Sequence, residues 1–167
     1  MPLLTLARAW LDDVRRNHAL EHGTVAVLFG RRGPQRLAGR ASGNGFFILG
    51  NVDAQTLESC AAEALARLKR GEASLAVSPM CGTNLAVTGA LCALFTMFSL
   101  SRSREKRAHE RIGDAISAST IGALASQPVG RLVQEYITTM ADHDHVQIIA
   151  VRQFTPWFSK VYTRRTR

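Results

Sequence analysis

Cysteine is scarce in this chain, and charge is missing from one long stretch of it. Only three cysteines occur among 167 residues, at Cys60, Cys81 and Cys92, which is too few and too scattered for a disulfide-stapled scaffold. No charged residue lies between Glu72 and Arg102. The 46% apolar composition excludes an intrinsically disordered chain. We therefore expect a folded protein with a reducing environment around it and one uncharged segment that needs its own explanation.

The sequence also lacks the pattern of a secretory signal peptide. Charged residues interrupt the opening segment before any long apolar run develops, at Asp12, Asp13, Arg15 and Arg16. Lysine and arginine number 21 against 13 acidic residues, a formal charge of +8, which favours an anionic partner such as lipid headgroups. The arginines are dispersed and no basic strip with interleaved aromatics is evident, so we expect no specific nucleic-acid partner.

The first 79 residues have the patterns of a small α+β domain. Helical periodicity predicts a helix over residues 5–22 that stops at Gly23, and a second helix over residues 54–70 that is capped by Asp53. Short apolar runs bounded by glycine and proline predict strands at residues 24–29, 35–40, 46–49 and 75–77. The strand, helix, strand order favours a right-handed crossover. The sheet is therefore expected to be mixed.

The uncharged segment predicts a membrane helix. Residues 85–100 are almost wholly apolar, and adding residues 82–84 reaches the ~20 residues that cross a bilayer; the central helix of a globular core is the alternative. A basic turn at residues 101–111 leads to a weaker apolar segment at residues 112–140. Small residues recur there every fourth position and form a ridge on which a neighbouring helix can pack closely: Ala118, Gly122, Ser126 and Gly130. Residues 80–140 are thus expected to form an apolar helical hairpin.

The end of the chain returns to strand-like sequence. Residues 146–151 predict a strand that rejoins the sheet, so the α+β domain comprises residues 1–79 and 141–155. Residues 156–167 mix aromatic and basic side chains, as expected either of a tail at a membrane–water boundary or of a solvated terminus. The expected fold is α+β, a small mixed sheet with two flanking helices and an inserted apolar hairpin, with the domain on the cytoplasmic side of a membrane. Whether the hairpin spans or is re-entrant stays open.

One short motif has the spacing of a metal site. In His18-Ala-Leu-Glu21-His22 the helical periodicity places all three polar side chains on the inward face of the first helix. Burying them without partners would cost several kcal/mol, so hydrogen bonds or a metal ion must satisfy them. Two histidines four residues apart can chelate one zinc ion, and Glu21 can act as general base. A hydrogen-bonded structural role is the alternative.

The motif resembles the inverted zinc motif of the inverzincin peptidases. That resemblance implies His18 and His22 as zinc ligands and Glu21 as the catalytic base. The family takes its third ligand from a glutamate on a later helix, whereas residues 73–101 contain no glutamate here. A third ligand is then expected from Glu58, from Cys81, or from the Asp142–His145 cluster.

Over most of its length the chain resembles an uncharacterised family of small bacterial membrane-associated proteins. The shared segments are the His18–His22 motif, Arg36–Arg40, Gly45-Phe46, Glu63–Leu68, Leu75–Val77, Cys81–Leu85 and Gln134–Thr139. The family has no established activity, so this resemblance implies an architecture and leaves the chemistry open.

Two functions compete on the sequence alone. The first is a membrane-associated zinc-dependent hydrolase built on the histidine motif. The second is a noncatalytic accessory subunit that docks onto a larger membrane complex through the ridge from Ala118 to Gly130. Membrane lipid is a partner in both.

Overall fold

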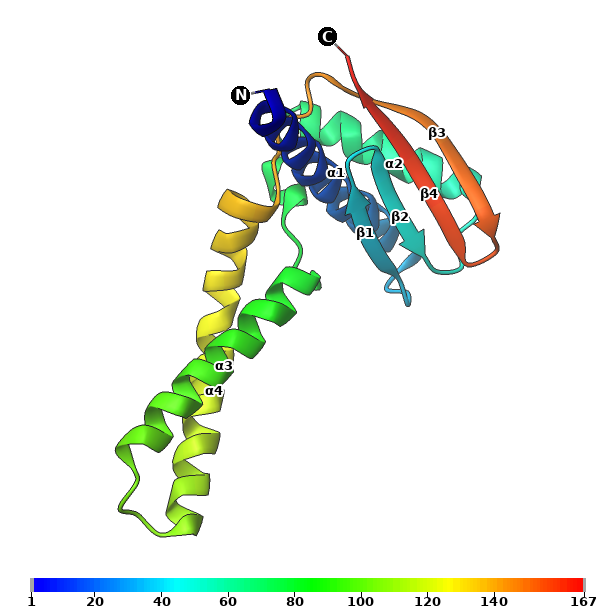
Figure 1. The fold of residues 1–167 in the computed structure, drawn as a ribbon. Helices are drawn as coiled ribbons and strands as arrows, with labels where there is room; N and C mark the ends of the chain where they lie inside the picture. The colour runs from blue at the N-terminus through cyan, green and yellow to red at the C-terminus, as the bar shows by residue number, and fades with distance from the viewer. Residues whose placement is uncertain (1, 167) are drawn as a thin grey trace. The chain divides into compact units, whose positions relative to one another are not determined.

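One long helix, α1 (Pro2–Arg32), occupies the region for which the sequence predicts a helix followed by a strand (Figure 1). The expected stop at Gly23 and strand at residues 24–29 are wrong. A Cβ at Gly23 would lie 3.3 Å from the Ala64 Cβ on a second helix, so glycine permits close packing there instead of ending the helix. The β-branched Thr24 is accommodated because its hydroxyl donates to the Leu20 carbonyl at 2.7 Å. A short apolar run does not by itself distinguish helix from strand.

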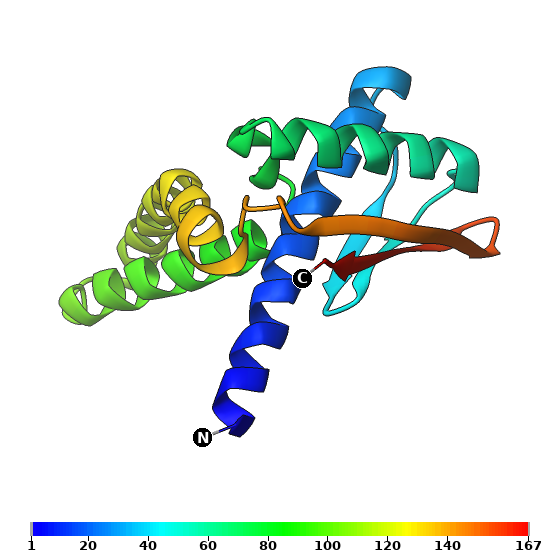
Figure 2. The same cartoon turned by 90° about the horizontal axis from the view of Figure 1, so that it is seen from above.

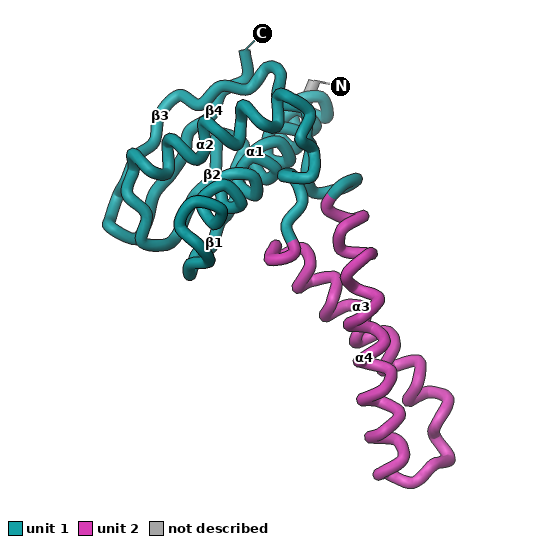
Figure 3. The backbone as a smooth tube through the Cα atoms, turned by 180° about the vertical axis from the view of Figure 1, so that it is seen from behind, with its two compact units in different colours: residues 1–78, 135–167 teal, residues 79–134 magenta. Residues whose placement is uncertain are grey.

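The computed structural model describes residues 2–166, and these divide into two compact units, which Figure 3 colours separately. Unit 1 comprises residues 1–78 and 135–167, and unit 2 comprises residues 79–134. Unit 1 holds α1, a four-stranded sheet and helix α2, so the α+β class is confirmed. Unit 2 is a helical hairpin inserted between two segments of unit 1.

The sheet of unit 1 is wholly antiparallel, with the strand order β1-β2-β4-β3. Its strands are β1 (Ala38–Ser42), β2 (Gly45–Leu49), β3 (Val146–Thr155) and β4 (Phe158–Arg165). The expected strand at residues 75–77 is instead a short 3-10 helix, η1 (Ala73–Ala76), and the expected crossover and mixed sheet are therefore wrong. The predicted return of the 146–151 segment to the sheet is confirmed.

Helix α2 (Ala54–Lys69) packs on the same core as α1. Asp53 caps it as predicted: the carboxylate accepts from the Thr56 amide at 2.8 Å, and hydrogen bonds from Thr56 lower the pKa of Asp53 to about 2. The core side chains of α1 and α2 meet those of the sheet, and the central members are Leu20, Leu28, Phe46, Ile48, Leu57, Ala61 and Val161. Figure 2 gives a second view of these elements.

The aromatic and basic tail expected at residues 156–167 is not a tail. Residues 158–165 form β4, which lies between β2 and β3 in the sheet. Val161 is fully buried in the core, whereas the flanking Lys160 and Tyr162 side chains stand on the opposite face. The signal for this strand was its period-2 alternation, which the charged and aromatic composition obscured.

Unit 2 consists of α3 (Gly82–Arg102) and α4 (Ala108–Val133), followed by a π-helical turn, η2 (Gln134–Thr138). The small residues of α4 face α3: a Cβ at Gly122 would lie 2.9 Å from the Cys92 Cα, and the Ser126 and Thr88 hydroxyl oxygens are 2.7 Å apart. The ridge from Ala118 to Gly130 is therefore used inside the hairpin. Gly122, Ser126 and Gly130 are the buried residues of α4.

Helix α3 is long and apolar enough to cross a membrane. Its 21 residues span about 31 Å, which matches a hydrocarbon core of about 30 Å. Large apolar side chains point outward from both hairpin helices, among them Leu94, Met97, Phe98, Ile116 and Leu124. Burial in a globular core, the alternative explanation for this sequence, does not account for α3, because only 6% of its most apolar window is buried.

Candidate metal centre

The central turns of α1 carry the histidine motif on their buried side. Asn17, Ala19, Leu20, Glu21 and His22 are all buried, and His18 is partly buried. The two imidazole rings lie one turn apart with their centroids separated by 4.4 Å. Trp10 and Leu11, which helical periodicity places on the same face one to two turns earlier, are more than half exposed. The inward face thus begins one to two turns later than the periodicity indicates.

Each histidine of the motif is oriented by a backbone carbonyl. His18 Nδ1 lies 3.0 Å from the Thr138 carbonyl oxygen, and His22 Nδ1 lies 2.8 Å from the Ala76 carbonyl oxygen. Because a carbonyl oxygen only accepts, the proton of each neutral imidazole is held on Nδ1. The lone pair is therefore on Nε2 of both rings. Histidines that bind zinc in proteins are commonly oriented in this way, with Nδ1–H donating to a carbonyl and Nε2 binding the metal.

The Thr138 carbonyl is brought to His18 by a segment that lies along α1. Arg15 donates to the carbonyls of Tyr136 and Thr139, at 3.0 and 3.3 Å, and the Met140 amide donates to the Arg15 carbonyl at 3.2 Å. We call residues 136–143 the strap. Sequence reasoning missed it because backbone carbonyls carry no side-chain signal.

His143 anchors the far end of the strap. It is 1% exposed, with Nδ1 2.8 Å from the Ala141 carbonyl oxygen and Nε2 2.9 Å from the Arg16 carbonyl oxygen. Since both partners only accept, both contacts are hydrogen bonds only when the ring is an imidazolium. The Asp142–His145 cluster does approach α1, but His143 has a structural role there, while Asp144 and His145 are exposed. Among residues 2–166, no member of the Asp142–His145 cluster belongs to the His18, His22 and Cys81 group.

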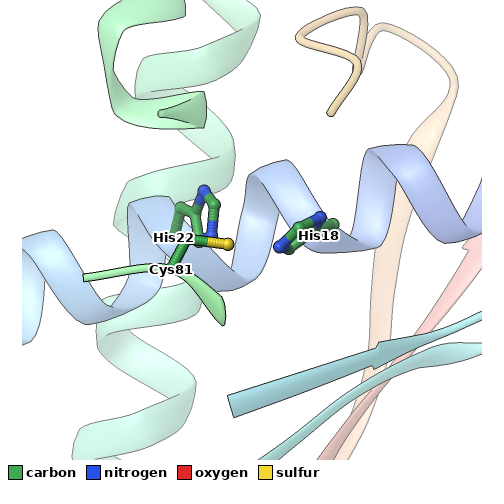
Figure 4. Close-up of side chains that lie close together, drawn as sticks. All are labelled: His18, His22 and Cys81. Atoms are coloured by element: carbon green, nitrogen blue, oxygen red, sulfur yellow. The ribbon is translucent and has the colours of Figure 1, made fainter. Parts of the chain in front are cut away.

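Cys81 is the N-cap of α3, and its Sγ accepts from the Thr83 amide at 3.4 Å. A helix N-terminus favours the thiolate, which is the form that binds metals. Cys81 follows Ala76, the carbonyl partner of His22, by five residues. The ligand atoms of His18, His22 and Cys81 lie within 4.8 Å of one another, and Figure 4 shows these three side chains.

The other candidate ligand does not belong to this group. Glu58 is exposed on α2, next to the buried Leu57, and its carboxylate is not a member of the His18, His22 and Cys81 group. Among residues 2–166, His18, His22 and Cys81 form the group that can hold a metal ion.

Glu21 lies between α1 and the edge strand of the sheet. It is 8% exposed, and a Cβ at Gly39 of β1 would overlap its carboxylate. Gly39 therefore gives the carboxylate the room it occupies against the β1 backbone. On the helix Glu21 is next to His22 and one turn from His18, while its carboxylate lies against Gly39 and is not a member of the His18, His22 and Cys81 group.

The donor set matches zinc chemistry. Around zinc, bond lengths of 2.0–2.3 Å put tetrahedral ligands roughly 3.3–3.8 Å apart, and the three ligand atoms here lie within 4.8 Å of one another. Imidazole and thiolate are borderline and soft ligands, which zinc accepts readily and which calcium and magnesium do not. Three protein ligands leave the fourth position of a tetrahedron open.

Comparisons with known proteins identify relatives without assigning a function. A family model described as Domain of unknown function (DUF6391) matches residues 13–151. An uncharacterised protein of Picosynechococcus sp. is 36% identical over 135 residues, which cover 75% of this chain and 65% of the relative. The chain thus matches slightly less than two thirds of that relative's length. No solved structure matches.

Proposed function

We propose, from the premise that the chain belongs to the DUF6391 family of unknown function, that it is a membrane-associated protein with a three-ligand zinc site. The observation that carries the proposal is the grouping of the His18, His22 and Cys81 ligand atoms within 4.8 Å, together with the Nδ1–carbonyl contacts that orient the two imidazole rings. Cys81 supplies the third ligand. The apolar outer faces of α3 and α4 support association with a bilayer.

The reaction class that fits such a site is hydrolysis. A catalytic zinc keeps one position open, whereas structural zinc sites are closed by four protein ligands. Zinc bound there would polarise a substrate carbonyl and lower the pKa of a bound water. The Glu21 carboxylate would accept the proton from that water, and the Gly39 backbone restricts where the carboxylate can lie. His18 and His22 would hold their orientation through Thr138 and Ala76.

The ligand set is tested by cobalt substitution. Protein purified in detergent should contain about one zinc per chain, as expected of a mononuclear site. After chelation and replacement with Co²⁺, we expect a sulfur-to-metal charge-transfer band in the near ultraviolet, because Cys81 contributes a thiolate. The Cys81→Ser variant should lose this band, whereas Cys92→Ser, whose thiol faces the Ser119 carbonyl inside the hairpin, should keep it. A cobalt spectrum without any thiolate band would contradict the ligand set.

The hydrolytic role is tested separately through Glu21. Glu21→Gln should bind zinc with the wild-type stoichiometry and lose about 10²–10⁴-fold of any hydrolytic rate found in a screen of peptide and ester substrates, since the amide cannot accept the proton. Glu58→Gln, an exposed change of the same type on α2, serves as the control. If Glu21→Gln hydrolyses as fast as the wild type, Glu21 is not the base, although the zinc site itself would stand.

A further inference from the structure

The outer face of the unit 1 sheet, opposite the helices, carries a continuous row of basic and aromatic side chains. Four directly paired positions cross all four strands in the order Arg40, Phe47, Lys160 and Arg152. Directly paired residues of an antiparallel sheet project from the same face. Arg164, two residues from Tyr162 on β4, adds a fourth cation to this face.

The positive charge of this face is not neutralised. The four strands, which are described in full, contain no aspartate or glutamate. Ion pairs with carboxylates occur elsewhere in residues 2–166, but none of them involves Arg40, Arg152, Lys160 or Arg164. An anionic surface would complement this face.

Three large apolar side chains are exposed at one end of the same sheet. Leu49, Phe154 and Trp157 are 54%, 51% and 60% exposed. They belong together because Leu49 pairs with Phe158, the Gly50 amide donates to the Trp157 carbonyl, and the Phe154 and Phe158 rings are 5.6 Å apart. We call Leu49, Phe154 and Trp157 the apolar tip. An exposed apolar cluster beside cations is the composition that enters the boundary of a bilayer.

The aromatic rings on the face itself are already occupied, which argues against stacking of nucleic-acid bases. Lys160 Nζ lies 4.5 Å from the Phe47 ring centroid and 4.6 Å from that of Tyr162, and the Phe47 and Phe158 rings stack on each other. Single-stranded nucleic acids need aromatic faces open to the bases. The accessible rings are instead those of the apolar tip, which lies at an end of the strands.

We infer that this sheet face is a second membrane-binding surface, in which the apolar tip inserts at the headgroup boundary and Arg40, Arg152 and Arg164 bind anionic lipid headgroups. The inference concerns unit 1 and does not depend on the zinc site. The sequence predicted that residues 156–167 could lie at a membrane boundary as a tail. In this inference Arg164 contacts lipid from strand β4 instead.

Trp157 fluorescence in the full chain tests this inference. The chain has two tryptophans, so Trp10→Phe leaves Trp157 as the single emitter. The protein is reconstituted in vesicles of phosphatidylcholine alone and of phosphatidylcholine with phosphatidylglycerol. We expect Trp157 emission to shift to the blue and to be quenched by brominated lipid in the anionic vesicles, and both effects to weaken at high salt because surface charges are screened. Trp157→Phe, which leaves Trp10, should respond much less to phosphatidylglycerol.

Charge variants identify the residues responsible. In the phosphatidylglycerol vesicles, Arg40→Gln and Arg152→Gln should each lower the ratio of lipid-contacting to water-exposed Trp157 about fivefold, whereas Arg70→Gln on the helical side should leave this ratio unchanged. The salt dependence of Trp157 emission is measured with all arginines in place. It therefore tests the inference even if one of the arginine variants fails to fold. Identical Trp157 emission in neutral and anionic vesicles would overturn the inference. A change in Trp157 emission on adding a single-stranded oligonucleotide, with no change on adding anionic lipid, would overturn it in favour of nucleic-acid binding.

Discussion

Replacing both His18 and His22 with alanine is expected to abolish stoichiometric zinc binding and to lower the affinity by far more than 100-fold. Mutation of a residue that only orients a metal ligand typically lowers the metal affinity 10–100-fold, and this variant removes two of the three ligands themselves. The Cys81 thiolate alone does not hold a zinc ion in a defined geometry. Elemental analysis of the purified variant measures the loss directly.

The same variant should also lose the stabilisation that zinc provides. A ligand at about 1,000 times its Kd stabilises the folded state by about 4 kcal/mol, so added zinc should raise the melting temperature of the wild type and leave that of the variant unchanged. His109→Ala and His145→Ala are matched controls, because both histidines are exposed and lie outside the ligand group. A double variant that still binds one zinc per chain would show that the metal is held elsewhere.

Replacing His143 with alanine is expected to destabilise unit 1 by about 3–5 kcal/mol. The change removes the imidazole that contacts the Ala141 and Arg16 carbonyl oxygens at a buried position, where an unsatisfied polar group costs about 1–3 kcal/mol, and it leaves a cavity. Chemical denaturation in detergent, monitored by the tryptophan signal, measures the free energy of unfolding.

His143→Ala should also weaken zinc binding by about 10–100-fold, although His143 is not a ligand. It secures the strap that presents the Thr138 carbonyl to His18, and loss of such an orienting contact has an effect of this size. His145→Ala, which changes an exposed neighbour, is the control. Unchanged zinc affinity in a destabilised His143→Ala protein would mean that the strap supports the fold without orienting His18.

The elements that the sequence determined are those with strong local signals. The Asp53 cap and the helix that follows it, the uncharged run of α3 and the small-residue ridge of α4 follow from local composition and periodicity. The α+β class and the return of β3 to the sheet were predictable for the same reason. So was the motif on α1, because residues three and four apart share a helix face whatever surrounds them.

Tertiary packing decided the remainder. The run after Gly23 is helical where Val27 and Leu28 pack into the core that α2 and the sheet share, and β4 is a central strand because β2 and β3 pair with both of its edges. The orientation of His18 and His22 depends on carbonyls 120 and 54 residues away in the chain. Local sequence cannot identify such partners, because every residue has a backbone carbonyl. Only the tertiary structure determines which carbonyl lies beside a given histidine.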